Sequence, residues 1–230
     1  FMGLEKYFQL EGLAYRLVPY VSNSTDGQTG AINTDIMYQN LVHKFKWGGL
    51  NDTNLYFDET NTRMVMNYRN NYSRLAENLF SKGDTSRAIE VVDKCMYEFP
   101  REVVNLTYFA IPIIDIYYKS GEVNKGDNLL STMIDDYFKE YYYLSDFDKG
   151  SGIKQNLNIA NQVLGSLTRV LQIHERDDAS FKYFKESQED DKDIEGVFKY
   201  FKSNDNSNKE EINYSTYRIN TFLDEFYALQ

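Results

Sequence analysis

The residues that could perform nucleophilic or acid–base chemistry are few in this chain. There are two histidines, His43 and His174, and one cysteine, Cys95. A nucleophile needs a base beside it. His43 falls on the polar side of its predicted helix, and His174 falls at a helix end, where the helix dipole favours an imidazolium. Cys95 stands where a buried small residue is expected, so we predict no catalytic residue.

Acidic pairs offer a second possible chemistry, the binding of a cation. The segment DFDKG at 146–150 begins like a calcium loop, but its glycine comes one place early and no glutamate closes it. An Asp-x-Asp pair can also hold a cation on a sugar nucleotide, but that use needs a nucleotide-binding fold. The acidic run at 189–193 indicates a solvated face. We therefore expect no metal site and no cofactor.

Length and charge narrow the classes of partner. The chain has 230 residues and a formal net charge of −10. This charge argues against nucleic acid, whose binding depends on Lys and Arg at the phosphates. No apolar run approaches the roughly 18 residues of a membrane span, so we expect no direct membrane insertion by this segment. The first residue is Phe1 rather than an initiator methionine, and we expect a fragment of a longer protein.

The segment 72–100 carries the clearest structural signal. Apolar residues recur at helical spacing on both sides of Gly83, and Pro100 ends the second run. The offsets match the tetratricopeptide unit of about 34 residues, with the small residues Ala76 and Ala88 where two helices approach. A weaker second unit is centred on Gly121. We expect the interior proline of its first helix, Pro112, to kink that helix.

The rest of the chain reads as helices and polar connectors. We expect a helix over 33–45, a long helix capped by Asp58 with Met64 on its apolar face, an amphipathic helix over 153–174 and a final helix over 209–229. Residues 4–8 indicate a helical turn and residues 13–21 an extended segment. Residues 177–201 indicate two short helices or one interrupted helix with an acidic middle, and a solvated linker, SNDNSNKEE, follows them. The predicted fold is all-α, with tetratricopeptide-like hairpins stacked in a short array. The boundaries are 1–57 for a partly irregular N-terminal segment, 58–144 for the hairpins and 145–230 for capping helices.

A helical array can bind ligands on its concave face. Placing Tyr72 and Ala110 at the fourth repeat position puts a polar and aromatic set on the inner side of the first helices. Such a set can hold a peptide backbone or stack on a sugar ring, or it can simply pack against the next helix. The candidate binding residues are Asn70, Ser73, Glu77, Phe80, Tyr108, Ile111, Asp115 and Tyr118.

Three strings carry a resemblance to a known family: GLEKYFQLEGLAYRLVP at 3–19, NTDIMYQNLVHKFKWGGLND at 33–52 and the repeat at 69–100. Together they resemble the C-terminal part of large bacterial multi-spanning membrane proteins that are similar to protein O-mannosyltransferases and are placed among the glycosyltransferases. The resemblance covers roughly residues 1–140. It includes Tyr15, Arg16, Trp47, Gly48 and Gly49, for which it implies no specific role.

The resemblance implies an exported accessory domain, on the periplasmic side of the inner membrane, tethered to a membrane-embedded catalytic part absent from this chain. From the residues and the resemblance together we expect a non-catalytic domain that binds protein or acceptor polypeptide. The alternative is a carbohydrate-binding helical module of a glycan-utilisation system. An enzyme in its own right would require two facing carboxylates in a cleft.

Overall fold

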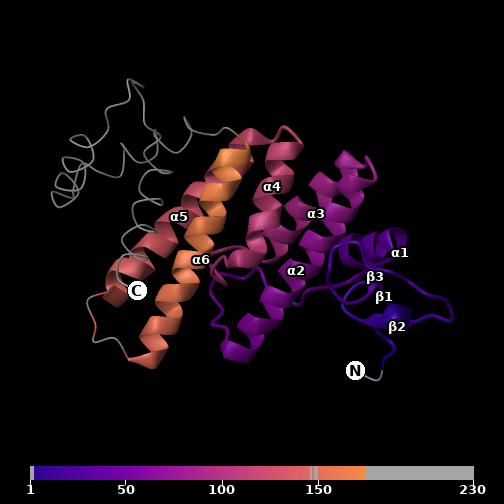
Figure 1. The fold of residues 1–230 in the computed structure, drawn as a ribbon, viewed down its shortest axis with the longest axis horizontal. Coiled ribbons are helices and arrows are strands. Elements are labelled where there is room, and N and C mark those ends of the chain that lie inside the picture. The colour runs from indigo at the N-terminus through magenta and orange to yellow at the C-terminus, as the bar shows by residue number, and fades with distance from the viewer. Residues whose placement is uncertain (1–2, 146, 148–149, 175–230) are drawn as a thin grey trace. The chain divides into compact units, whose positions relative to one another are not determined.

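The computed structural model describes residues 3–145, 147 and 150–174, and this part of the chain is mostly helical with a small three-stranded sheet (Figure 1). The chain divides into two compact units, Phe1–Gly126 and Asp127–Gln230. The predicted elements at 177–208 and 209–229, the acidic run 189–193 and most of the loop 146–150 lie outside the described residues. No helix of the described part is long and apolar enough to cross a membrane.

The first unit begins with a short 3-10 turn and the sheet. Turn η1 spans Glu5–Tyr7, and the strands are β1 Phe8–Leu10, β2 Tyr15–Leu17 and β3 Ala31–Ile32. Strand β1 pairs antiparallel with β2 and parallel with β3, so the order is β2-β1-β3. The predicted helical turn at 4–8 forms over Glu5–Tyr7, but Phe8 already begins β1, and of the predicted extended segment 13–21 only Tyr15–Leu17 is a strand. The pairing with β3 was not predicted, because its two residues follow a polar loop.

The predicted helix at 33–45 forms as α1, Thr34–Tyr38, continued by a π-helical turn, η2, Gln39–Lys44. Asn33 caps it by accepting a hydrogen bond from the Ile36 N–H. Met37 and Leu41 are completely buried. The predicted helix therefore exists, with its last turn widened.

The long helix α2, Glu59–Ser81, begins at the predicted cap, where the Asp58 carboxylate accepts from the Asn61 N–H at 2.8 Å. Its apolar face was predicted one residue out of register near the start, since Met64 is 48% exposed and Val65 is buried. The buried positions at that end include Arg69. A prediction from apolar residues alone does not count a buried arginine, and it therefore placed the buried face on the neighbouring row of residues. Helix α2 contacts α1, α3, α4, η3 and β3, and it is the element on which the unit is assembled.

Two helix-turn-helix junctions have the same geometry. Helix α2 is followed by α3, Thr85–Glu98, and helix α4, Ile111–Lys119, by α5, Val123–Ser145. Gly83 and Gly121 have φ of +81° and +82°. At each junction the glycine N–H bonds three residues back, and the next N–H bonds five residues back. This pattern is that of a Schellman cap, which needs a residue of positive φ.

Pro112 does not kink a helix. A 3-10 turn, η3, Tyr108–Ala110, leads into α4, and Pro112 is the second residue of that helix. A proline in the first helical turn removes an N–H that has no partner within the helix. The expected kink is therefore wrong, because α4, the first helix of the second predicted repeat, begins later than the repeat pattern placed it.

Each helix of the second unit carries a buried apolar stripe. Helix α6, Ser151–Ile173, matches the predicted helix at 153–174. Its predicted stripe is confirmed over the interior positions, with Ile153 and His174 only half-buried at the ends. The buried residues of that stripe are Leu157, Ala160, Leu164, Leu167 and Leu171.

Candidate functional site

The predicted inner face is built by α2 and α4, which contact each other directly. The Ser73 hydroxyl donates to the backbone carbonyl of Phe109 in turn η3, at 3.0 Å. One helical turn further along α2, the Glu77 carboxylate lies close enough to Asp115 of α4 for the two charges to interact. The structure therefore brings Ser73, Glu77 and Asp115 to one side of the α2–α4 pair, which we call the α2/α4 face.

Glu77 is the carboxylate of this face that lacks a cation of its own. Asp115 forms an ion pair with Lys119, one turn along α4, at 2.5 Å. Glu77 makes no hydrogen bond or ion pair with another described residue, although its side chain reaches solvent. Partial burial, with repulsion from Asp115, raises the pKa of Glu77 above its ordinary value, and Lys119 opposes this rise. A cation approaching Glu77 would displace no ion pair among the described residues, although the charges of Lys119 and Arg74 already act on this carboxylate.

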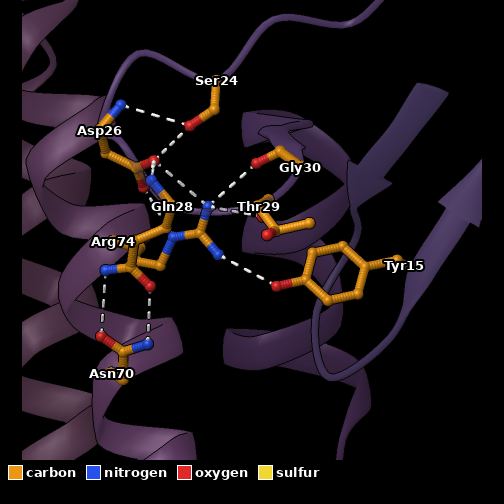
Figure 2. Close-up of polar contacts among 8 residues, drawn as sticks. All are labelled: Tyr15, Ser24, Asp26, Gln28, Thr29, Gly30, Asn70 and Arg74. Carbon is orange, nitrogen blue, oxygen red and sulfur yellow. Dashed lines mark hydrogen bonds and ion pairs between the residues drawn. The ribbon is translucent and has the colours of Figure 1, made fainter. Parts of the chain in front are cut away.

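The first predicted residue of the face, Asn70, is already occupied. Its side-chain amide exchanges two hydrogen bonds with the amide of Gln28, at 3.1 and 3.4 Å. Gln28 belongs to the loop between β2 and β3. We call residues 24–30 of that loop the strap, because they are held against α2 by side-chain contacts (Figure 2).

Arg74 holds the strap most extensively. Its side chain is only 2% exposed, and its guanidinium meets the Asp26 carboxylate at 2.6 Å. The same guanidinium donates to the backbone carbonyls of Gly30, at 2.9 Å, and Thr29, at 3.2 Å, and approaches the Tyr15 hydroxyl at 3.4 Å (Figure 2). Burial alone would raise the pKa of Asp26, but the hydrogen bonds that its carboxylate accepts hold that pKa below its ordinary value.

The aromatic members of the predicted face differ in their exposure. Tyr108 is 55% exposed, and its ring lies 4.5 Å from that of Phe109, centroid to centroid. Tyr118 is buried, and a Cβ added at Gly126 would lie 2.7 Å from its ring. Tyr118 thus packs over Gly126 and has no free ring face for a ligand, whereas Tyr108 has one. The remaining members of the face, Phe80 and Ile111, are half-buried.

Trp47 lies in an aromatic cluster. Its ring centroid is 4.9 Å from that of Phe99 and 5.3 Å from that of Tyr68, and the side chain is 9% exposed. Gly48 and Gly49 follow it in a turn with φ of +61° and +79°. Packing of Trp47 and formation of the turn account for the Trp-Gly-Gly sequence, which is one part of the pattern on which the resemblance rests.

The other two residues of that pattern lie on strand β2. Tyr15 contacts Arg74 through its hydroxyl and stacks on Phe8, with the ring centroids 5.8 Å apart. Arg16 is exposed and pairs with Glu11 at 2.9 Å. Tyr15 thus belongs to the strap contacts, and Arg16 lies outside them.

Two buried arginines, Arg69 and Arg74, were not singled out from the sequence. Both belong to α2 at positions that flank its apolar residues, and this position in the sequence was the one signal that they are buried. A cation within or beside an apolar stripe indicates a buried partner. The partners themselves, such as Asp26, are more than 25 residues distant in sequence and leave no local pattern.

Comparisons with protein-family models, with curated proteins and with solved structures find no match to this chain. Among the described residues, no group of three or more His, Cys, Asp or Glu side chains is arranged to hold a metal ion. Cys95 is buried, and burial raises its pKa to about 12. The function must therefore be argued from the α2/α4 face and the strap.

Proposed function

We propose that this chain is a tetratricopeptide-like helical-repeat domain that binds polypeptide. The repeat assignment is supported by the matching glycine caps at Gly83 and Gly121. It is further supported by Ala76 and Ala88, which are completely buried on two helices that contact each other. In this assignment, α2 and α4 are the first helices of successive units and present the inner face.

The observation that carries the binding proposal is that the Glu77 carboxylate of the α2/α4 face forms no ion pair or hydrogen bond with any residue that the structure describes. Asp115 and Asp26 flank it electrostatically, and each of those has its own cation in Lys119 or Arg74. A lysine or arginine side chain of a bound polypeptide would complete the set with a charge-assisted hydrogen bond. The exposed ring of Tyr108 adds apolar contact area beyond Ser73.

We further propose that the domain is the accessory part of a membrane glycosyltransferase-like protein and lies on the periplasmic side of the inner membrane. Its partners would then be an acceptor polypeptide and the membrane-embedded part of its own chain. This placement rests on the resemblance of residues 3–19, 33–52 and 69–100. All three strings fall within the unit Phe1–Gly126, where they form β1, β2, α1, η2, the second half of α2 and α3.

Binding of short lysine-containing peptides to the 230-residue chain, measured by calorimetry, tests the proposal. Glu77→Gln should weaken binding by at least about tenfold, because a hydrogen bond to a charged group contributes about 1.5–3 kcal/mol and each 1.4 kcal/mol is about a factor of ten. Glu59→Gln is the matched control, since Glu59 is an exposed glutamate of the same helix and should leave the affinity unchanged. The proposal is refuted if Glu77→Gln and the unchanged chain bind the peptides equally. It is also refuted if replacing the peptide lysine by glutamine leaves the affinity unchanged.

Tyr108 also favours a second candidate, a carbohydrate-binding module. An exposed aromatic ring backed by a second ring, here Phe109, can stack on the apolar face of a sugar. On a glycan array the chain should then bind oligosaccharides, and Tyr108→Ala should abolish that binding. A blank array would remove this candidate and leave the polypeptide proposal standing.

A further inference from the structure

The strap is attached to α2 by side chains rather than by backbone pairing. Residues 24–29 make no backbone–backbone hydrogen bond with any other described segment. Their attachment consists of the Asp26 carboxylate and the Gln28 amide, which meet Arg74 and Asn70, together with two backbone carbonyls bound by Arg74 (Figure 2). The strap thus lies on α2 in the way that a bound peptide would.

We propose that the α2 surface beneath the strap is a docking surface for an acidic polypeptide segment, with the strap as its resident occupant. The proposal deepens the proposed function and rests on it in one respect, that a polypeptide docks along α2. Asn70 and Arg74 stand four residues apart, so their side chains are neighbours on one face of the helix. They meet a carboxylate and then a carboxamide, two residues apart in a segment that bends at Gly27, where φ is +71°.

The burial of Arg74 determines what the competing segment must carry. When one partner of a buried ion pair is removed, the remaining charge is left without compensation, which is strongly unfavourable. A segment that replaces the strap must therefore supply its own carboxylate to Arg74, and an amide or similar group to Asn70. Neutral or basic segments cannot displace the strap, because they leave the guanidinium unpaired.

The strap lowers the apparent affinity of α2 for a separate acidic segment, because the two compete for the same side chains. A tethered segment competes at an effective concentration of the order of millimolar. A free peptide with the same contacts must exceed this concentration before it displaces the strap. Weakening the strap should therefore reveal the docking surface to a peptide that the unchanged chain binds poorly.

The experiment uses the 230-residue chain and a synthetic peptide that copies residues 22–31, SNSTDGQTGA. The chain carrying Asp26→Asn and Gln28→Ala should bind this peptide at least about tenfold more tightly than the unchanged chain does, because the competing strap is weakened. A peptide with asparagine in place of its aspartate should lose that binding. If the substituted chain binds both peptides equally, or binds neither, the proposal is overturned.

A second measurement needs no substitution. The Gln28 side-chain amide donates to the Asn70 side chain of α2 at 3.4 Å, so its hydrogen exchange reports on the attachment of the strap to α2. Saturating the unchanged chain with the aspartate peptide should accelerate this exchange, and the asparagine peptide should not. Unchanged exchange at saturation overturns the proposal even if the double variant fails to fold.

The two proposals fail separately. Glu77→Gln should lower the affinity for the lysine peptides and leave the affinity for the aspartate peptide undiminished. A failure with lysine peptides alone rejects the role of the α2/α4 face, and a failure with the aspartate peptide alone rejects the docking surface beneath the strap.

Discussion

Arg69 of α2 is completely buried, and its guanidinium holds the chain that follows α3. It donates to the backbone carbonyls of Phe99 at 2.8 Å, Val104 at 2.6 Å and Asn105 at 2.7 Å. Burial lowers the pKa of Arg69 from its ordinary value, yet an arginine keeps its charge at any physiological pH. Replacing Arg69 by methionine keeps an apolar stem and removes all three bonds.

The expected loss of stability follows from two opposing effects. Three hydrogen bonds to a charged donor contribute about 1.5–3 kcal/mol each, or roughly 5–9 kcal/mol together. Removing the buried charge returns several kcal/mol of desolvation cost. We therefore expect Arg69→Met to lower the free energy of unfolding by about 3 kcal/mol, much of it because the carbonyls of the loop lose their donor.

Urea denaturation followed by circular dichroism measures this change. With a urea slope of about 2 kcal/mol/M, the midpoint should fall by about 1.5 M. Arg63→Met is the matched control, because Arg63 belongs to the same helix, is 73% exposed and, among the described residues, pairs only with Glu59 one turn away. That pair is worth about 0.3–0.5 kcal/mol. If the two variants differ by less than about 1 kcal/mol, Arg69 does not hold the loop as argued.

Three further predictions concern the strap and the buried interior. The pKa of Asp26 is lowered from its ordinary value of 3.8, so its pairing with Arg74 stabilises the fold fully above pH 3.8. This stabilisation is lost as the pH falls through the lowered pKa. The difference in unfolding free energy between the unchanged chain and Asp26→Asn, measured by urea titration, should therefore shrink below about pH 4. Gly126→Ala should destabilise by about 1–3 kcal/mol, because the new methyl group meets the buried ring of Tyr118. The Cys95 thiol, with its pKa raised to about 12, should resist a thiol reagent at pH 8 until urea unfolds the chain.

Each of these predictions has a contrary outcome. A constant difference between the unchanged chain and Asp26→Asn across the acid range would show that this carboxylate is not held by Arg74. For Gly126 the control is Gly152→Ala in α6, where a Cβ meets nothing within 4 Å and helix propensity alone should stabilise by up to about 1 kcal/mol. Prompt labelling of Cys95 in the native state would show that the helix pair around it opens easily.

Local rules predicted most of the helices. The caps at Asn33 and Asp58 and the turn at Gly83 follow from groups within three residues of each other, and the structure has all three. Pro112 was misassigned because the position at which a helix begins depends on the preceding loop. The sheet was not predicted because β1 and β3 are two or three residues long and pair across a loop.

The candidate site was predictable only where it depends on helical periodicity. Ser73 and Glu77 fall on the face that their spacing indicates, and Asp115 joins them from α4. Asn70 was placed on the same face, but its occupation by Gln28 was not foreseen, since the contact spans 42 residues of sequence. The burial of Tyr118 depends on Gly126, whose lack of a side chain leaves the space that this ring occupies.

The two buried arginines of α2 each hold a loop against that helix. Arg69 and Arg74 are five residues apart, which separates them by about 140° around the helix. One holds the chain after α3, and the other holds the strap, in each case through backbone carbonyls. Ser73 fixes turn η3 by the same kind of bond. Because these donors reach backbone atoms of each loop, many loop side chains can change while the α2/α4 face around Glu77 keeps its geometry, but Asp26 cannot, since its carboxylate pairs with Arg74.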